Sequence, residues 1–259
     1  MNKLIGLLSA ALFILVPTIA SAAVGSALGV NPQAVSGTRV LVVGADIFIG
    51  DLIETGPSGQ VQIRFQDDTE LVVGPSSSLR IDDYLIRNNG SAGKLAVDML
   101  SGAFRFATGD SAKNRYIINT PTGTIGVRGT EFDVFVYRDD AAMMKTEILL
   151  YNGVVIFCTE GNVCKTLSEF CEIGELTLEQ AEIVGDSRLT DRHVRAGYRA
   201  NFIYAEDQSP LRRDFWFARA RECLNVAPVL PSFPEFTETE TDKCDQFSPP
   251  AECWEDQPG

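Results

Sequence analysis

The segment Thr120–Val134 has the sequence TPTGTIGVRGTEFDV and carries the strongest structural signal in the chain. It sets Gly123, Gly126 and Gly129 among β-branched and other apolar residues. Glycine at this density beside strand-forming residues indicates a backbone that bends tightly while it stays in a sheet. We therefore predict strands on both sides of the segment, with Pro121, Gly126 and Gly129 at turns.

Short strands are predicted around this segment, over residues 36–185. Residues Val61–Phe65 alternate strictly between apolar and polar side chains, which is typical of a strand with one buried face. Turn-forming pairs such as Asn152–Gly153 separate the apolar runs. No long helical pattern lies between the runs, which argues against parallel strands joined by helices. The sequence predicts a mainly β fold, in which many short strands form a β-solenoid-like or sandwich-like body.

A helical extension is predicted for residues 186–224. A helix is predicted to begin at Ser209 and Pro210, because Ser can cap the helix and Pro fits its first turn. A further helix is expected at about Asp191–Ala205. The apolar side chains of the helix after Ser209 would pack on the β body: Leu211, Phe215, Trp216, Ala218, Ala220 and Cys223. Four arginines would stay in solvent: Arg212, Arg213, Arg219 and Arg221.

The two ends of the chain have a different character. Residues 1–22 resemble a secretory signal peptide, with Lys3, the apolar run Leu4–Ile19 and small residues before a predicted cleavage after Ala22. The mature protein is therefore expected to be periplasmic or secreted, without a membrane span, and a retained membrane anchor is the alternative. Residues 225–259 are rich in proline and acidic residues, and they predict an irregular acidic tail.

The overall charge narrows the choice of partner. The formal net charge is −13 at pH 7. Binding to nucleic acid needs a basic face, and adhesion to anionic lipid needs basic clusters. We therefore expect neither of these partners.

The chain has six cysteines, and all of them lie in its C-terminal half. An even number of cysteines in an exported chain indicates disulfides. Pairing between sequence neighbours would join Cys158 to Cys164, Cys171 to Cys223, and Cys244 to Cys253, although six cysteines allow other pairings. No C-x-x-C pair occurs and there is a single histidine, so no metal site is predicted.

Several separate stretches carry a resemblance to a known family. They are Gly50–Gly56 (GDLIETG), Phe65–Leu71 (FQDDTEL), Gly74–Ile81 (GPSSSLRI), Leu100–Phe106 (LSGAFRF), Thr120–Val134 and Tyr151–Val155 (YNGVV). In this order, the stretches resemble the pattern of the FecR domain of bacterial envelope proteins. The resemblance places Gly50, Asp51 and Gly102 at structural turns. Two residues depart from the pattern, since Asp68 stands where the family usually has glycine and Gly123 where it usually has alanine.

The resemblance implies a β-rich module outside the cytoplasm. The best-known members are transmembrane regulators whose outer module senses a loaded outer-membrane transporter, often for iron. Their N-terminal cytoplasmic part controls a sigma factor. Because a leader-like segment opens this chain, we expect only the envelope module to carry over.

Three residues are candidates for a binding site: Arg128, Thr130 and Arg105. Arg128 has two interpretations, since it could contact a partner on a glycine-opened surface or bond to turn carbonyls or an inner carboxylate. The second interpretation is the simpler one. Arg105 is expected on the outer face of its strand, in contact with solvent.

No catalytic residues or cofactors are predicted. A catalytic triad would need His193, and no nucleophile motif accompanies it. Asp67–Asp68 and Asp82–Asp83 are adjacent pairs, but neighbouring strand residues point to opposite faces and do not converge. The chain also lacks nucleotide-binding motifs.

These observations lead to two hypotheses on function. In the first, the chain is an exported, non-catalytic FecR-type module that binds an envelope protein or surface polymer, in signalling or transport regulation. In the second, it is a structural or assembly protein of the envelope or extracellular matrix.

Overall fold

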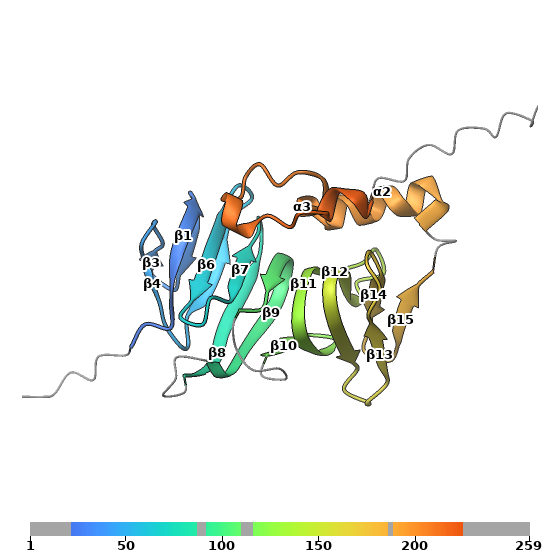
Figure 1. The fold of residues 1–259 in the computed structure, drawn as a ribbon, viewed down its shortest axis with the longest axis horizontal. Helices are drawn as coiled ribbons and strands as arrows, with labels where there is room; N and C mark the ends of the chain where they lie inside the picture. Colours follow the sequence, from blue (N-terminus) through green and yellow to red (C-terminus); the bar gives the residue numbers. More distant parts are fainter. Residues whose placement is uncertain (1–21, 87–91, 110–115, 186–188, 225–259) are drawn as a thin grey trace, which may run out of the picture. The chain divides into compact units, whose positions relative to one another are not determined.

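A computed structural model describes residues 22–86, 92–109, 116–185 and 189–224 (Figure 1). Most of the predicted signal peptide and the acidic tail, including Cys244 and Cys253, lie outside the described residues.

The described chain forms fifteen strands in one sheet, so the mainly β prediction is confirmed. The strands are β1 (Gly25–Asn31), β2 (Ala34–Ser36), β3 (Arg39–Val40), β4 (Asp46–Ile47), β5 (Leu52–Thr55), β6 (Gln60–Phe65), β7 (Glu70–Val73), β8 (Ser78–Ile86), β9 (Ala92–Ala107), β10 (Tyr116–Thr120), β11 (Gly123–Arg138), β12 (Met144–Cys158), β13 (Cys164–Leu167), β14 (Ile173–Leu176) and β15 (Ala181–Val184). The sheet starts before residue 36, because β1 pairs with β6.

The sheet folds over itself into two facing layers. One layer, which we call the helix side, follows the order β4–β1–β6–β7–β9–β11–β12–β14–β15. The other, the open side, contains β2, β3, β5, β8, β10 and β13 together with the remaining parts of β9, β11 and β12. Apolar side chains from both layers meet in one cluster, which includes Ile63, Phe104 and Phe132 from the helix side and Leu79 and Phe157 from the open side.

Three long strands pass from one layer to the other. Each contains a glycine with positive φ near its middle: Gly102 in β9 (φ 101°), Gly129 in β11 (φ 61°) and Gly153 in β12 (φ 86°). At these points the strands change neighbours, and β11 has a register shift between Arg128 and Glu131. Left-handed backbone is open to glycine and costs most other residues energy. The glycines thus allow one strand to serve both layers.

The residues after β15 cover the outer face of the helix side. They form α2 (Arg192–Asn201), α3 (Ile203–Glu206) and two short 3-10 turns, η1 (Arg213–Phe215) and η2 (Ala220–Glu222). Figure 1 shows these elements lying across one layer of the sheet. Asp191 caps α2 by accepting hydrogen bonds from the backbone N–H groups of His193 and Val194. The helix expected near residues 191–205 is therefore present, as α2 and α3.

The continuous helix expected after Ser209 is wrong. The side chain of Gln208 accepts a hydrogen bond from the Phe217 N–H at 2.8 Å and donates one to the Phe217 carbonyl at 3.0 Å. These bonds engage backbone groups that a helix would pair internally. The segment consequently loops between η1 and η2 while Leu211, Phe215 and Phe217 remain buried.

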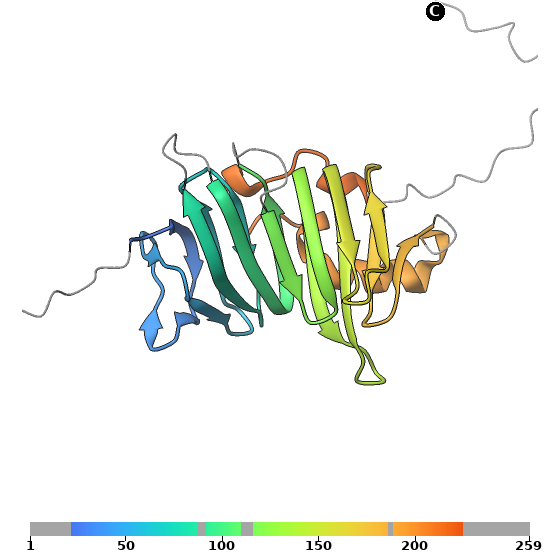
Figure 2. The same cartoon turned by 90° about the horizontal axis from the view of Figure 1, so that it is seen from below.

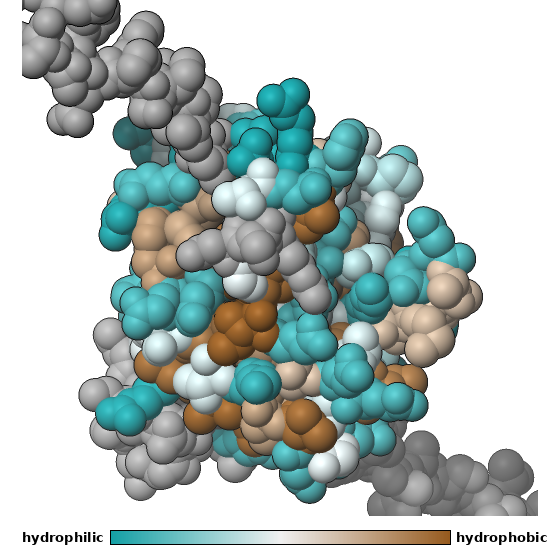
Figure 3. Space-filling model, turned by 90° about the vertical axis from the view of Figure 1, so that its right-hand side faces the viewer, coloured by the Kyte–Doolittle hydropathy of each residue, from teal (hydrophilic) through white to brown (hydrophobic). Residues whose placement is uncertain are grey.

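Hydrophobic surface also occurs at the edge of the sheet that carries β13, β14 and β15. Figure 3 looks onto this side and shows hydrophobic areas interrupted by hydrophilic ones. Exposed apolar side chains in these elements and their connections include Val163, Leu178 and Ile183. Among the described helices, none combines the length and the apolar character that a membrane crossing requires.

Candidate functional site

Arg105 lies in β9 directly opposite Asp133 in β11, on the outer face of the helix side. Its Nε and Nη2 atoms donate to Asp133 Oδ1 and Oδ2 at 2.7 and 2.9 Å. Only 2% of Arg105 is exposed, which corrects the expectation of a solvated residue. The strand orientation was as expected, but the extension after β15 covers this face.

Aromatic rings and polar atoms complete the surroundings of the Arg105 guanidinium. Its central carbon lies 4.2 Å from the centre of the Phe217 ring and 5.5 Å from that of Tyr204. The guanidinium Nη2 also donates to the Tyr204 carbonyl at 3.0 Å, and Nη1 donates to Gln208 Oε1. Burial is the largest single effect and lowers the pKa of Arg105, but the interactions with the Asp133 carboxylate and the Tyr151 hydroxyl together raise the pKa above its ordinary value. Arg105 therefore stays charged and holds the extension on the sheet.

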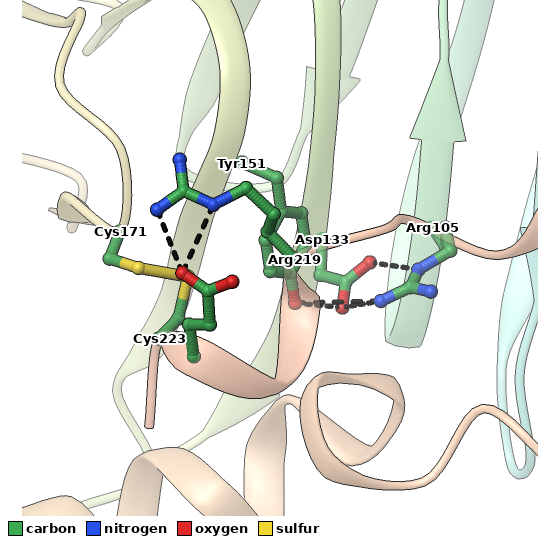
Figure 4. The surroundings of a disulfide bond; sticks show 7 residues. Arg105, Asp133, Tyr151, Cys171, Arg219 and Cys223 are labelled. Carbon is green, nitrogen blue, oxygen red and sulfur yellow. Dashed lines mark hydrogen bonds and ion pairs between the residues drawn. A yellow bond between two sulfur atoms is a disulfide. The ribbon is translucent and has the colours of Figure 1, made fainter. Parts of the chain in front are cut away.

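The extension makes further polar contacts with the sheet. The Tyr204 hydroxyl donates to Gln60 Oε1 at 2.7 Å, and the Arg212 N–H donates to Gln62 Oε1 at 2.7 Å. Cys171, just before β14, is joined by a disulfide to Cys223 after η2 (Figure 4). This face is thus occupied by the chain itself, and Arg105 is not accessible to a partner in this state.

The two disulfides within the described chain are the expected ones, Cys158–Cys164 and Cys171–Cys223. The first closes the hairpin between β12 and β13, where the two cysteines are register partners. The second joins residues 52 positions apart and fastens the extension. The pairing expected between Cys244 and Cys253 lies outside the described residues.

Figure 2 shows the strands of the open side from the side away from the helices. A groove lies along β11 on this side of the sheet. Its volume is about 940 Å³. We call it the β11 groove. Its described lining residues are Tyr116, Ile117, Thr124, Gly126, Val127, Arg128, Gly129, Val154, Ile156 and Cys158. The outward residues of β11 form its floor, and residues of β10 and β12 form its walls.

Gly126 creates the hollow in this groove. The expected turn at Gly126 is wrong, because the residue lies within β11 and pairs with Ile117 on one side and Ile156 on the other. A Cβ atom built on Gly126 would meet nothing closer than the Ile156 carbonyl oxygen at 3.9 Å. Ile117 and Ile156 are 37% and 48% exposed. The missing side chain therefore leaves an apolar space that opens to solvent.

Among the described residues that line the β11 groove, Arg128 alone is charged. Its side chain is exposed, and no hydrogen bond or ion pair joins it to any described residue. The bonds to turn carbonyls or an inner carboxylate that the simpler interpretation requires are thus absent from the described part of the chain. The two arginines differ from expectation in opposite ways, since Arg105 is the buried ion-pair partner and Arg128 is free to contact a ligand.

Thr130 does not join Arg128 in the groove. It is 2% exposed, and its N–H donates to Thr108 Oγ1 at 2.9 Å. Its own hydroxyl finds no hydrogen-bond partner within the described ranges. The residue lies at the register shift after Gly129, where β11 leaves the open side.

The predicted turn residues have local structural roles. Gly50 has a positive φ of 87°, and Asp51 accepts hydrogen bonds from the Ser36 hydroxyl and the Arg39 guanidinium at 2.6 and 2.7 Å. Pro121 lies in the turn between β10 and β11. Asp68 has a φ of 61°, so it takes the left-handed backbone that glycine usually supplies.

Gly123 also has a local reason for its departure from the family pattern. A Cβ atom at this position would lie 2.1 Å from the Cys158 carbonyl oxygen. Alanine would therefore not fit here without movement of the backbone.

The residues considered for catalysis are not brought together. His193 is exposed in the first turn of α2. Asp67 is buried, and its carboxylate accepts hydrogen bonds from Tyr84 and Tyr116 at 3.1 and 2.8 Å. The described residues contain no group of three or more acidic, histidine or cysteine side chains placed to hold a metal ion.

Comparison with known proteins identifies the central part of the chain. Residues 51–162 match the family model described as FecR protein, so the resemblance stated above is confirmed for this segment. No curated protein matches the chain. Two crystal structures of a candidate anti-sigma factor from Parabacteroides distasonis are similar at 17% sequence identity, with TM-scores of 0.40 and 0.39. Each match covers 51% of this chain, which spans 57% of those chains.

Proposed function

We propose that this chain, which carries a FecR domain over residues 51–162, is an exported module of envelope signalling that acts by binding another envelope protein. The two disulfides fit an oxidising compartment outside the cytoplasm. The module does no chemistry of its own in this proposal, and contact with the partner is its activity.

The β11 groove is the single observation that carries the proposal. The helix side is filled by the chain's own extension, whereas the open side presents a hollow with apolar walls. Exposed concave apolar surface with a few polar groups is typical of a binding site. The positive charge of Arg128 at the edge of the groove orients the partner and selects among partners by their charge.

Crosslinking in living cells tests this assignment. A photoreactive amino acid would replace Ile156, which is 48% exposed in the groove wall, and in a matched variant Trp216, which is 40% exposed on the extension. We expect one discrete crosslinked species from position 156 and none of the same mass from position 216. Identical products from both positions would contradict the groove as the contact surface. A ladder of self-crosslinked multimers would favour a structural or assembly protein.

Export needs its own measurement. If residues 1–22 are removed on export, the protein recovered from the periplasm or medium should begin at Ala23. Intact mature chain confined to the cytoplasm would contradict this part of the proposal.

A further inference from the structure

The β11 groove has two chemically different parts on one strand. Thr124, Gly126 and Arg128 point to the same face of β11, because alternate residues of a strand share a face. The hollow lies over Gly126, and the guanidinium comes from the residue two positions further. Residues i and i+2 of a strand are about 6–7 Å apart. A ligand that uses both parts therefore needs an apolar group and a group for the cation at about this separation.

The hollow favours a large apolar side chain. Its walls include the exposed side chains of Ile117 and Ile156, and Gly126 adds no side chain between them. The Gly126 position is open above its backbone, since the only atom within 4 Å of a built Cβ is one carbonyl oxygen. An inserted leucine, isoleucine or phenylalanine side chain would bury its own surface and that of both walls.

The cation favours a carboxylate. Arg128 has no ionic partner among the described residues, and none of the described lining residues is acidic. This local charge contrasts with the net charge of −13 for the chain. A guanidinium presents a planar set of donors that fits a carboxylate in two parallel hydrogen bonds. A polyanion such as nucleic acid would meet one cation and a strongly acidic protein, which is unfavourable.

On this basis we infer that the β11 groove binds a polypeptide segment of the partner that presents a large apolar side chain and a carboxylate about two strand residues apart. Gly126 determines selectivity for the apolar side chain, and Arg128 determines selectivity for the acid. This inference rests on the proposed function, because it names the chemistry of the partner at the same surface.

Selection from a displayed library of random twelve-residue peptides tests this chemistry. The bait is the full exported chain with its disulfides intact. We expect enriched peptides to contain Asp or Glu near Leu, Ile or Phe. On the Arg128→Glu variant the same selection should instead enrich Lys or Arg near the apolar residue. Arg221→Glu is the matched control, since Arg221 is exposed on η2 outside the groove, and it should return the wild-type peptides.

Affinity measurements with one enriched peptide then distinguish the contribution of Arg128 from that of the hollow over Gly126. Replacement of its acid by the corresponding amide should weaken binding to wild type about tenfold or more, as expected for loss of a charge-assisted contact. The same replacement should strengthen binding to Arg128→Glu, because it removes the repulsion between the peptide carboxylate and the negative charge introduced at position 128. Gly126→Leu should weaken binding of both peptides, because the new side chain occupies the hollow. The melting temperature of each variant shows whether it is folded.

Two results would overturn the inference. One is enrichment of peptides without acidic residues on the wild-type chain, and the other is equal affinity of wild type and folded Arg128→Glu for the acidic peptide. If crosslinking in cells captures a partner at position 156 but acidic peptides do not bind, the proposed function stands and this partner chemistry is wrong. If acidic peptides bind but no envelope protein is captured, the ligand chemistry of the groove stands and the proposed function is wrong.

Discussion

Arg105 and Asp133 are register partners on β9 and β11, and they form a two-pronged ion pair beneath the extension. Both side chains are at most 3% exposed. Removal of one partner from a buried pair leaves an uncompensated charge and costs about 3–5 kcal/mol. We therefore expect Asp133→Ala to lower the free energy of unfolding by about this amount, as measured by urea denaturation.

A surface pair serves as the control for this prediction. Arg219 and Glu222 are joined at 2.7 Å but are 61% and 55% exposed. Exposed ion pairs are screened by solvent and contribute little. Glu222→Ala should therefore leave the unfolding midpoint nearly unchanged. Equal losses in the two variants would mean that burial of the Arg105 pair is not what gives it its importance.

The disulfide between Cys171 and Cys223 should stabilise the protein more than the one between Cys158 and Cys164. Their sequence separations are 52 and 6 residues. Loop-closure entropy of the unfolded chain predicts contributions of about 4 and about 2 kcal/mol, respectively. We expect the double serine variant of Cys171 and Cys223 to show the larger loss in urea denaturation.

Hydrogen exchange can locate this effect. Loss of the Cys171–Cys223 bond should accelerate exchange in α2, α3 and η2, which the bond fastens to the sheet, before it affects β6 or β7. The Cys158/Cys164 double serine variant should accelerate exchange near the β12–β13 hairpin instead. Uniform acceleration through the whole chain in both variants would contradict local fastening.

Gly129 tests the role of positive φ in the long strands. Its φ is 61°, and a built Cβ meets nothing within 4 Å, so any cost of substitution comes from the backbone. We expect Gly129→Val to lower the free energy of unfolding by about 1–3 kcal/mol, because a β-branched residue resists this conformation. Gly129→Asn should cost less, since asparagine tolerates left-handed backbone. Equal melting temperatures for the Val variant and wild type would show that β11 can cross between layers without glycine.

Glu147 should make stability depend on pH. Burial raises its pKa above the ordinary value, although Asn201 and Tyr137 donate hydrogen bonds to its carboxylate. The folded state therefore keeps the proton at pH values where the unfolded chain has lost it. The stabilisation is fully present below the unfolded pKa of about 4.3 and is lost as pH rises through the folded pKa.

The Glu147→Gln variant isolates this titration. The stability of wild type minus that of the variant should decrease as pH rises from about 4, and then become constant above the folded pKa. Glu54→Gln, at an exposed position on β5, provides the control. Parallel pH curves for wild type and Glu147→Gln would contradict the prediction.

The sequence predicted the strands well because their signal is local. Alternation within Val61–Phe65 and the glycines of the Thr120–Val134 segment depend on the strand itself. The two-residue period of a strand also predicted correctly that Arg105 lies on the outer face of its strand. Its burial was not, because it depends on residues 204–217, about a hundred positions later in the chain.

The role of Gly126 also depends on residues distant in the sequence, but here they leave a space open instead of burying a side chain. A glycine between β-branched residues predicts a bend when the strand is considered alone. Its effect here depends on Ile117 and Ile156 in the neighbouring strands, which register pairing alone identifies. The break in helix after Ser209 likewise depends on the contact between Gln208 and Phe217. One signal was available for Arg105, since Asp133 stands between the apolar residues Phe132 and Val134 just as Arg105 stands between Phe104 and Phe106.

The cover over the helix side has a practical consequence for anyone who shortens the chain. A recombinant fragment cut at the family boundaries, residues 51–162, would lose β1 from beside β6 and all elements from β13 onward. Val72, Arg105 and Leu149 would then lose the side chains of the extension that now bury them and would be exposed to water. Such a fragment should aggregate during purification. A recombinant chain should therefore run from about residue 23 to at least Leu224.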